Sequence, residues 1–199
     1  MPAKKSNILI IYAHPAGHKS RINAAMIAKA KEVEGVSVRE LYDIYPDFYI
    51  EIKKEQEALV ANDIIIWQHP FYWYSAPPLL KEWIDLVLQH NFAFGKDGNA
   101  LKGKKIFTAA TTGGSYEAYS EGGHNHFTVN QLLAPFEATA RLCKMQYLPP
   151  FIIHGSLLIS DKEINSAAEE YYTLLSALRN GLFDDDEITK HQYINHMIR

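Results

Sequence analysis

Three segments of this sequence carry side chains that could bind an anionic, planar ligand, and each follows an apolar run. The first, "AHPAGHKSRIN", places a hydroxyl, a guanidinium and an amide at Ser20, Arg21 and Asn23, where a helical pattern starts. Free N–H groups and the helix dipole at such a start favour a phosphate, and these side chains can add donors. A simple helix cap at Ser20 explains that residue equally well. The first segment therefore leaves a phosphate cradle and a cap as equal alternatives.

The second segment, "HPFYWYSAPP", groups Phe71, Tyr72, Trp73 and Tyr74. Large planar side chains suit a planar ligand through stacking and apolar burial. The alternative is that they fill space above a sheet or form a dimer interface, and we expect this of at least one of the four.

The third segment, "TTGGSYEAYSEGGHNH", combines a glycine turn with groups that exchange protons. Gly113 and Gly114 let backbone N–H groups turn toward a ligand and stabilise negative charge that develops on it. Farther on, Tyr119 and His124 could donate or accept a proton. A surface turn would also use glycines, so this segment by itself is weak evidence.

Alternating strand and helix patterns position these segments. Apolar runs predict strands at 7–12, 36–42, 63–68, 104–114 and 145–155, the last interrupted by Pro149 and Pro150. Helical spacing predicts helices at 20–33, 55–60, 77–90, 128–143 with a kink at Pro135, and 160–181 with a Ser160/Glu163 capping box and a stop at Gly181. This α/β alternation favours a flavodoxin-like, doubly wound, five-stranded parallel sheet of order 2-1-3-4-5 with helices on both faces.

In such a sheet the carboxyl ends of the strands meet at one edge, so the three segments should converge there. We assign residues 1–183 to one domain and the acidic residues 184–199 to a solvated or partner-contacting C-terminal extension.

Composition narrows the classes of function. The net charge of −3 over 199 residues gives no argument for nucleic acid binding. The single cysteine, Cys143, fits a reducing compartment and a core position rather than a nucleophile. No apolar run is long enough for a signal segment or a membrane span, so we expect a soluble, cytoplasmic protein. A histidine metal site is disfavoured because the "HNH" spacing defines no metal geometry, and a serine hydrolase lacks its G-x-S-x-G turn.

The chain resembles the flavodoxin-like NAD(P)H:quinone oxidoreductases. It is especially similar to the bacterial branch that includes ancillary proteins of glutathione-gated potassium-efflux antiporters. The matching motifs, spread from Ile8 to Leu182, are "YAHP", "HKSRIN", "YPDF", "WQHPFYWYSAPPLLKEWID", "TTGG" and "LPPF".

The resemblance implies a flavin, FMN in preference to FAD, and NADH or NADPH as electron donor. The implied flavin-binding residues are His14, Ser20, Arg21, Ile22, Asn23, Phe71, Tyr72, Trp73, Tyr74, Thr111, Thr112, Gly113 and Gly114, with no metal. Tyr119 matches the family's catalytic tyrosine, His124 matches its histidine after a one-residue shift, and Tyr72 replaces a common glutamine.

The resemblance also implies the reaction, a two-electron hydride transfer from NAD(P)H to a quinone-like acceptor by a ping-pong mechanism in one cavity. A homodimer is expected from the family. The alternative is a flavin-binding regulatory subunit that docks peripherally on a potassium-efflux antiporter at the inner face of the membrane.

Overall fold

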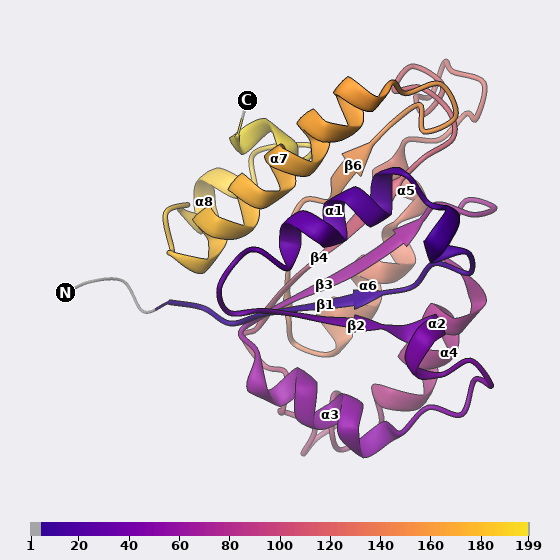
Figure 1. Ribbon diagram of the computed structural model, residues 1–199. Helices are drawn as coiled ribbons and strands as arrows, with labels where there is room; N and C mark the ends of the chain where they lie inside the picture. The colour runs from indigo at the N-terminus through magenta and orange to yellow at the C-terminus, as the bar shows by residue number, and fades with distance from the viewer. Residues whose placement is uncertain (1–4, 199) are drawn as a thin grey trace.

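The computed structural model describes residues 5–198, which form a parallel β-sheet with helices on both faces (Figure 1). The strands are β1 (Ile8–Tyr12), β2 (Val36–Glu40), β3 (Ile64–Pro70), β4 (Lys105–Thr111), β5 (Gln146–Tyr147) and β6 (Phe151–Ile153). The α-helices are α1 (Ile22–Ala30), α2 (Leu41–Ile44), α3 (Ile52–Ala61), α4 (Pro78–Val87), α5 (Val129–Leu132), α6 (Ala134–Leu142), α7 (Asp161–Arg179) and α8 (Asp185–Ile188). Short 3₁₀ helices are η1 (Gly17–Lys19) and η2 (Ile194–Met197).

The sheet has the order β2-β1-β3-β4-β5, with β6 also paired to β4, and every pairing is parallel. This confirms the predicted order 2-1-3-4-5. The fifth position is shared by two short strands because Pro149 and Pro150 have no backbone N–H to continue the ladder. The chain resumes pairing at Phe151, which lies opposite Ala109.

The sheet is buried on both faces, as the apolar runs predict. Helices α1 and α7 cover one face, where Met26 and Tyr171 belong to one buried cluster with residues of β1, β3 and β6 (Figure 1). Helices α4 and α6 cover the other face, where Trp83 and Phe136 pack. Because both faces are covered, the ends of the strands are the places where a ligand can reach the sheet.

Two predicted elements have different limits in the structure. The second strand ends at Glu40, and Tyr42 lies in α2 rather than in the strand. The helix predicted over 128–143 is two helices, α5 and α6, with Pro135 in the first turn of α6, where its missing N–H does not matter. The capping box of Ser160 and Glu163 at the start of α7 is confirmed.

The C-terminal residues 184–198 pack onto the domain instead of projecting into solvent. Ile188, Tyr193 and Ile194 are buried. The Asn195 side chain accepts a hydrogen bond from the N–H of Ile152 (2.9 Å) and donates one to the carbonyl of Ile152 (3.2 Å). Asn195 therefore pairs with the backbone of Ile152 in the way that one residue of a further strand would, and it satisfies that point of the outer edge of the sheet.

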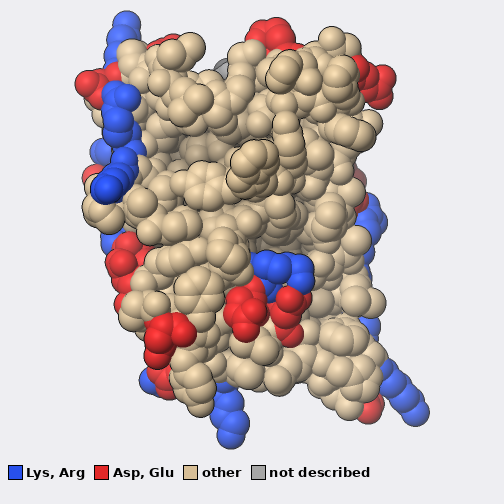
Figure 2. Space-filling model, turned by 90° about the vertical axis from the view of Figure 1, so that its right-hand side faces the viewer, with Lys and Arg blue, Asp and Glu red and all other residues tan. Residues whose placement is uncertain are grey.

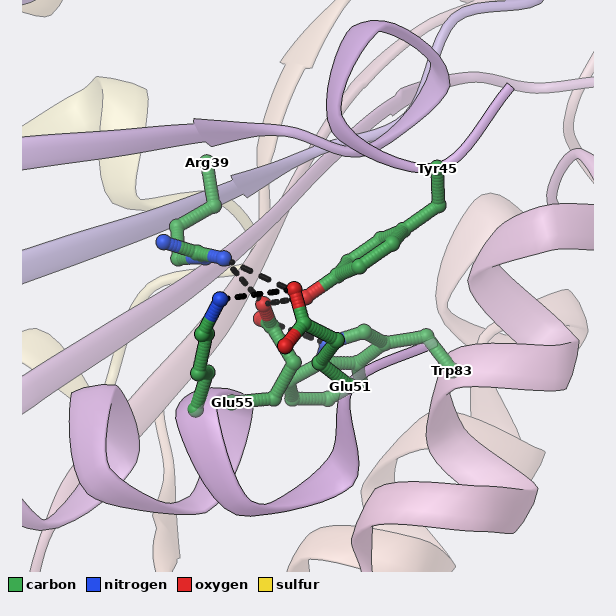
Figure 3. A network of polar contacts seen from close by, with 6 residues as sticks. Arg39, Tyr45, Glu51, Glu55 and Trp83 are labelled. Atoms are coloured by element: carbon green, nitrogen blue, oxygen red, sulfur yellow. Dashed lines mark hydrogen bonds and ion pairs between the residues drawn. The ribbon is translucent and has the colours of Figure 1, made fainter. Parts of the chain in front are cut away.

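A buried carboxylate ties α3 to its neighbours, as Figure 3 shows. Glu55 is fully buried and forms an ion pair with Arg39 of β2. It accepts hydrogen bonds from the hydroxyl of Tyr45 (2.6 Å) and the indole N–H of Trp83 (2.9 Å). Since its donors come from β2, the segment after α2, and α4, Glu55 fixes four parts of the chain around one point.

Candidate functional site

The loops that follow β1, β3 and β4 converge on one cavity of about 420 Å³, as predicted. The loop after β6 also contributes to it. The lining residues are His14, Ala16, Lys19, Ser20, Arg21, Ile22, Asn23, Pro70, Phe71, Tyr72, Thr111, Gly113, Ser156 and Leu157. Figure 2 shows the molecule from the side at which the strands end, and much of this hollowed face carries no charged side chain. The volume lies in the range of small-molecule sites.

The start of α1 presents unused donors to this cavity. Ser20 Oγ accepts the N–H of Asn23 (3.2 Å), as a helix cap does. Within residues 5–198, the N–H groups of Arg21 and Ile22 have no hydrogen-bond partner. Arg21 lines the cavity and donates to Asp161 of α7 (2.5 Å) on the surface. Free N–H groups, the helix dipole and a guanidinium make this wall suitable for a phosphate.

Asn23 is bound to the sheet rather than free to wrap a ligand. It is 2% exposed. Its amide donates to Thr111 Oγ1 (3.0 Å) and its carbonyl accepts from the amide of Gln68 (3.3 Å). Asn23 therefore links α1 to the ends of β3 and β4, which holds the donor-bearing helix start in place.

His14 lies at the cavity wall, and one hydrogen bond fixes which of its ring nitrogens carries the proton. Its Nδ1 accepts the N–H of Ala16 (3.1 Å), so in the neutral ring the proton is on Nε2. Burial lowers the pKa of His14 below its usual value, which favours that neutral ring. His14 also borders a second cavity of about 560 Å³ between α1 and α2, where Lys31 and Glu40 pair with each other (2.6 Å).

The aromatic segment divides between the cavity and the surface. Phe71 and Tyr72 line the cavity. Trp73 is 93% exposed, and the Tyr74 hydroxyl donates to Asn125 (3.1 Å). Trp73 and Tyr74 have φ angles of 47° and 61°, a left-handed conformation that is unfavourable for bulky residues. Such strain persists only where the surroundings impose it and is frequent at binding sites.

The third loop contributes residues to the cavity and to the layer behind it. Gly113 lines the cavity, whereas the buried Thr112 side chain bonds to Gly114 O and His154. A Cβ atom on Gly114 would lie 3.1 Å from the ring of Tyr119, so a larger residue here would have to displace that ring by a few tenths of an ångström. The Tyr119 ring packs on Phe71, with centroids 5.9 Å apart.

His124 is exposed on this loop, and its predicted catalytic role stays a prediction. The histidine whose ring does contact Tyr119 is His154, at a centroid distance of 5.9 Å.

The sequence reasoning missed the loop after β6. Ser156 and Leu157 line the cavity, and Leu157 is exposed. The sequence did indicate that this loop reaches the site, because the "FIIHG" strand must end at the same edge of the parallel sheet as the other strands.

Other classes of site find no support among residues 5–198. No three His, Cys, Asp or Glu side chains in this part of the chain lie close enough to hold a metal ion. Cys143 is buried in the core, as predicted, and burial raises the pKa of its thiol to about 11. No helix described in residues 5–198 is long and apolar enough to cross a membrane.

Acid should destabilise the fold through His69, at the end of β3. Its Nδ1 lies 2.9 Å from Pro70 O, its ring stacks on Phe136, and complete burial lowers its pKa from 6.5 to about 4. Between these values the unfolded chain binds more protons, so stability falls as the pH falls from 6.5 toward 4. When the pH falls from 7 to 5, we expect the altered pKa of His69 to lower the unfolding free energy by about 2 kcal/mol.

Urea unfolding at both pH values measures this loss. His69→Phe should weaken the pH dependence without abolishing it, because burial also lowers the pKa of His154 to about 4, whereas His126→Asn, at an exposed histidine, should leave it unchanged. Equal pH dependence in all three proteins would contradict the assignment.

Fold and cavity together define a doubly wound α/β protein with a cavity at the carboxyl ends of its strands. The family model described as "Flavodoxin-like fold" matches residues 6–175. The chain therefore belongs to this family.

Solved structures agree with the family assignment. The general stress protein 14 of Treponema denticola, in complex with FMN, is 37% identical with a TM-score of 0.83, over 86% of this chain and 99% of that one. An NADPH-quinone reductase of P. pentosaceus is 34% identical with a TM-score of 0.77, over 84% and 96%. A protein described as a thermophilic tryptophan halogenase from Streptomycin violaceusniger is 39% identical with a TM-score of 0.80, over 82% and 95%.

Proposed function

We propose that this protein is a flavin-dependent oxidoreductase that carries two electrons from NADH or NADPH to a quinone-like acceptor. The observation that carries the proposal is the meeting of unused N–H donors at the start of α1 with the Phe71 and Tyr72 rings around one cavity. A flavin phosphate requires the donors and a flavin ring requires the planar walls. When bound, the flavin would supply the redox chemistry by accepting and passing on a hydride.

The relatives support this activity without fixing its substrate. One relative is an NADPH-quinone reductase and another binds FMN, which favours FMN over FAD here. A third is described as a halogenase, and one fold commonly hosts several activities. The quinone acceptor, the nicotinamide preference and the ping-pong order therefore belong to the proposal.

The residues of this chain have separate tasks in the proposed reaction. Arg21 and the N–H groups of the α1 start would hold the phosphate, and Phe71 and Tyr72 would bury the ring. The neutral His14 can donate from Nε2, and the backbone at Gly113 can approach the ring without hindrance from a side chain. Tyr119, behind Phe71 and Gly114, would hold or deliver a proton.

A homodimer is part of the proposal. Trp73 protrudes beside the cavity residue Tyr72 and exposes a large apolar side chain. A second copy of this chain would bury that side chain in the dimer interface.

The visible spectrum of the protein with FMN, before and after anaerobic NADPH or NADH, tests the function. We expect bound FMN to bleach rapidly and to regain its colour when a quinone is added. Bound FMN that barely bleaches would instead favour the regulatory subunit of an antiporter. Absence of FMN and FAD binding would refute both.

Arg21→Ala should weaken FMN binding about tenfold, since a hydrogen bond to a charged group contributes about 1.5–3 kcal/mol. Its surface ion pair with Asp161 contributes about 1 kcal/mol or less, so the fold should survive. Titration of flavin fluorescence measures the affinity. Lys29→Ala is the matched control, because Lys29 also forms surface ion pairs on α1 but does not line the cavity. Equal FMN affinity in both variants would remove Arg21 from the phosphate site.

A double variant, Ser20→Ala with Asn23→Ala, should also weaken flavin retention, but it is a less selective test of the phosphate site than Arg21→Ala. In the structure, Asn23→Ala also leaves the buried amide of Gln68 and the hydroxyl of Thr111 without this partner. Loss of stability is therefore expected together with loss of flavin.

A further inference from the structure

Behind the third loop, away from the cavity, lies a polar contact whose proton positions can be deduced. The Thr112 hydroxyl lies 3.0 Å from Gly114 O and 3.0 Å from His154 Nδ1. A carbonyl oxygen only accepts, so the hydroxyl proton goes to Gly114. Thr112 Oγ1 must then accept a hydrogen bond from His154 Nδ1. The ring proton is therefore on Nδ1, and Nε2 carries none.

Backbone hydrogen bonds join the same two loops around His154. Thr112 N–H donates to Ile153 O, Gly155 N–H to Gly114 O, and Ser156 N–H to Thr112 O, each at 2.9 Å. The turn at 112–114 is thus fixed against the residues on both sides of His154. The Nδ1–H of His154 is the one side-chain donor from the 154–156 loop to this turn among residues 5–198.

Three tyrosine rings surround the His154 ring. The centroid distances are 5.5 Å to Tyr116, 5.9 Å to Tyr119 and 5.7 Å to Tyr193. Tyr193 is 3% exposed and belongs to the C-terminal segment that Asn195 fixes to β6. His154 Nε2 is buried without a hydrogen-bond partner in residues 5–198, and burial lowers the pKa of this imidazole to about 4. The ring is therefore neutral at pH 7 and keeps its Nδ1–H tautomer.

We propose that His154 is a positioning residue of the reaction: its Nδ1–H fixes Thr112, and through it the Gly113–Gly114 turn at the cavity. The C-terminal segment, through Tyr193, holds the His154 ring in the orientation that this bond requires. The role in the reaction rests on the proposed function, whereas the role in the turn does not. His154 touches neither cofactor nor substrate in this account, because it acts on the wall behind the cavity.

Two substitutions separate the donor from the ring. His154→Phe keeps an aromatic ring between the tyrosines and removes the donor. His154→Asn removes the ring and can present an amide N–H close to the place of Nδ1. His196→Phe is the matched control, because His196 contacts Tyr193 in the same aromatic group and has no contact with Thr112.

The first measurement needs no flavin. In ¹H–¹⁵N spectra of the flavin-free protein at pH 7, the His154 ring should carry its proton on Nδ1. The amide signals of Gly113 and Gly114 should shift and broaden in His154→Phe, and should return toward their original positions in His154→Asn. The signal of Gly123, at the far end of the loop, should stay in place. An Nε2–H tautomer, or an undisturbed Gly114 signal in His154→Phe, overturns the inference whether or not the protein binds flavin.

The second measurement is the rate of flavin reduction at saturating NADPH in stopped flow. We expect His154→Phe to slow it about tenfold, the effect of losing about 1.4 kcal/mol of positioning through one hydrogen bond. FMN affinity and the KM for NADPH should change less than the rate, and His154→Asn should recover most of it. A wild-type protein that binds no flavin would refute the proposed function alone. If the wild-type protein reduces its flavin and His154→Phe does so at the same rate, the inference alone is refuted.

Should His154→Phe fail to fold, Thr112→Val removes the acceptor of the His154 Nδ1–H together with the Thr112 bond to Gly114 O. The ¹⁵N signals of the His154 ring should then lose the fixed Nδ1–H tautomer, and an unchanged tautomer would overturn the inference.

Discussion

Tyr119→Phe should slow flavin reduction about a hundredfold while changing FMN affinity by about twofold or less, as loss of a general acid does. The ring of Tyr119 is 8% exposed and packs between Phe71 and His154, so phenylalanine keeps the packing and removes only the hydroxyl. Burial raises the pKa of Tyr119, and the charge of a nearby Tyr74 would raise it further. The phenol is therefore protonated at neutral pH and available as a donor.

Anaerobic stopped flow gives the reduction rate, and a fluorescence titration gives the FMN affinity. Tyr147→Phe is the control, since it removes the hydroxyl of a half-buried tyrosine, one that contacts Thr108 (3.0 Å) on β4 away from the cavity. Tyr119 is a structural residue if its variant weakens FMN binding more than it slows reduction. The same conclusion follows if both variants slow the reaction equally.

Glu55→Leu should lower the unfolding free energy by about 3 kcal/mol, the lower part of the range for breaking a buried ion pair. The variant leaves Tyr45 and Trp83, both buried, without the acceptor that Figure 3 shows between them. Arg39 is partly exposed, so water can solvate its guanidinium, and this keeps the cost from being higher.

Urea unfolding at pH 7 measures the loss. Glu57→Ala, an exposed carboxylate on the same helix, should change the unfolding free energy by about 0.5 kcal/mol or less. A Glu55→Leu protein as stable as this control would mean that the buried network contributes nothing to folding. Flavin binding should survive at low temperature, because Glu55 does not line the cavity.

The order of the sheet could be predicted because its signals are local. The runs "ILIIY" and "IIIW" are apolar at every position, which only a strand covered on both faces requires. Helices between such strands impose parallel crossovers, and the handedness rule leaves few orders. The limits of the elements were less predictable. The second strand stops at Glu40, because Leu41 turns into a core position in α2, and this depends on packing.

The candidate site was predicted in outline and not in its contacts. His14, Ser20, Arg21, Ile22, Asn23, Phe71, Tyr72, Thr111 and Gly113 do meet at one cavity. The predicted site residues that do not line it, although they lie in the same segments, are Trp73, Tyr74, Thr112, Gly114, Tyr119 and His124. A sequence shows that four aromatics are adjacent, but the left-handed backbone at Trp73 and Tyr74 decides which of them face the ligand.

The sequence by itself determined the strand order and the edge at which the loops meet, because both follow from periodicity and from rules of chain connection. Its motifs carried the resemblance to the family. The tertiary structure alone decided the partners. It bound Asn23 to Thr111 and Gln68, brought His154 to Thr112, and placed Tyr193 of the C-terminal segment against His154. These contacts join residues 39 to 88 positions apart, and no local pattern records which distant polar group will satisfy a buried one.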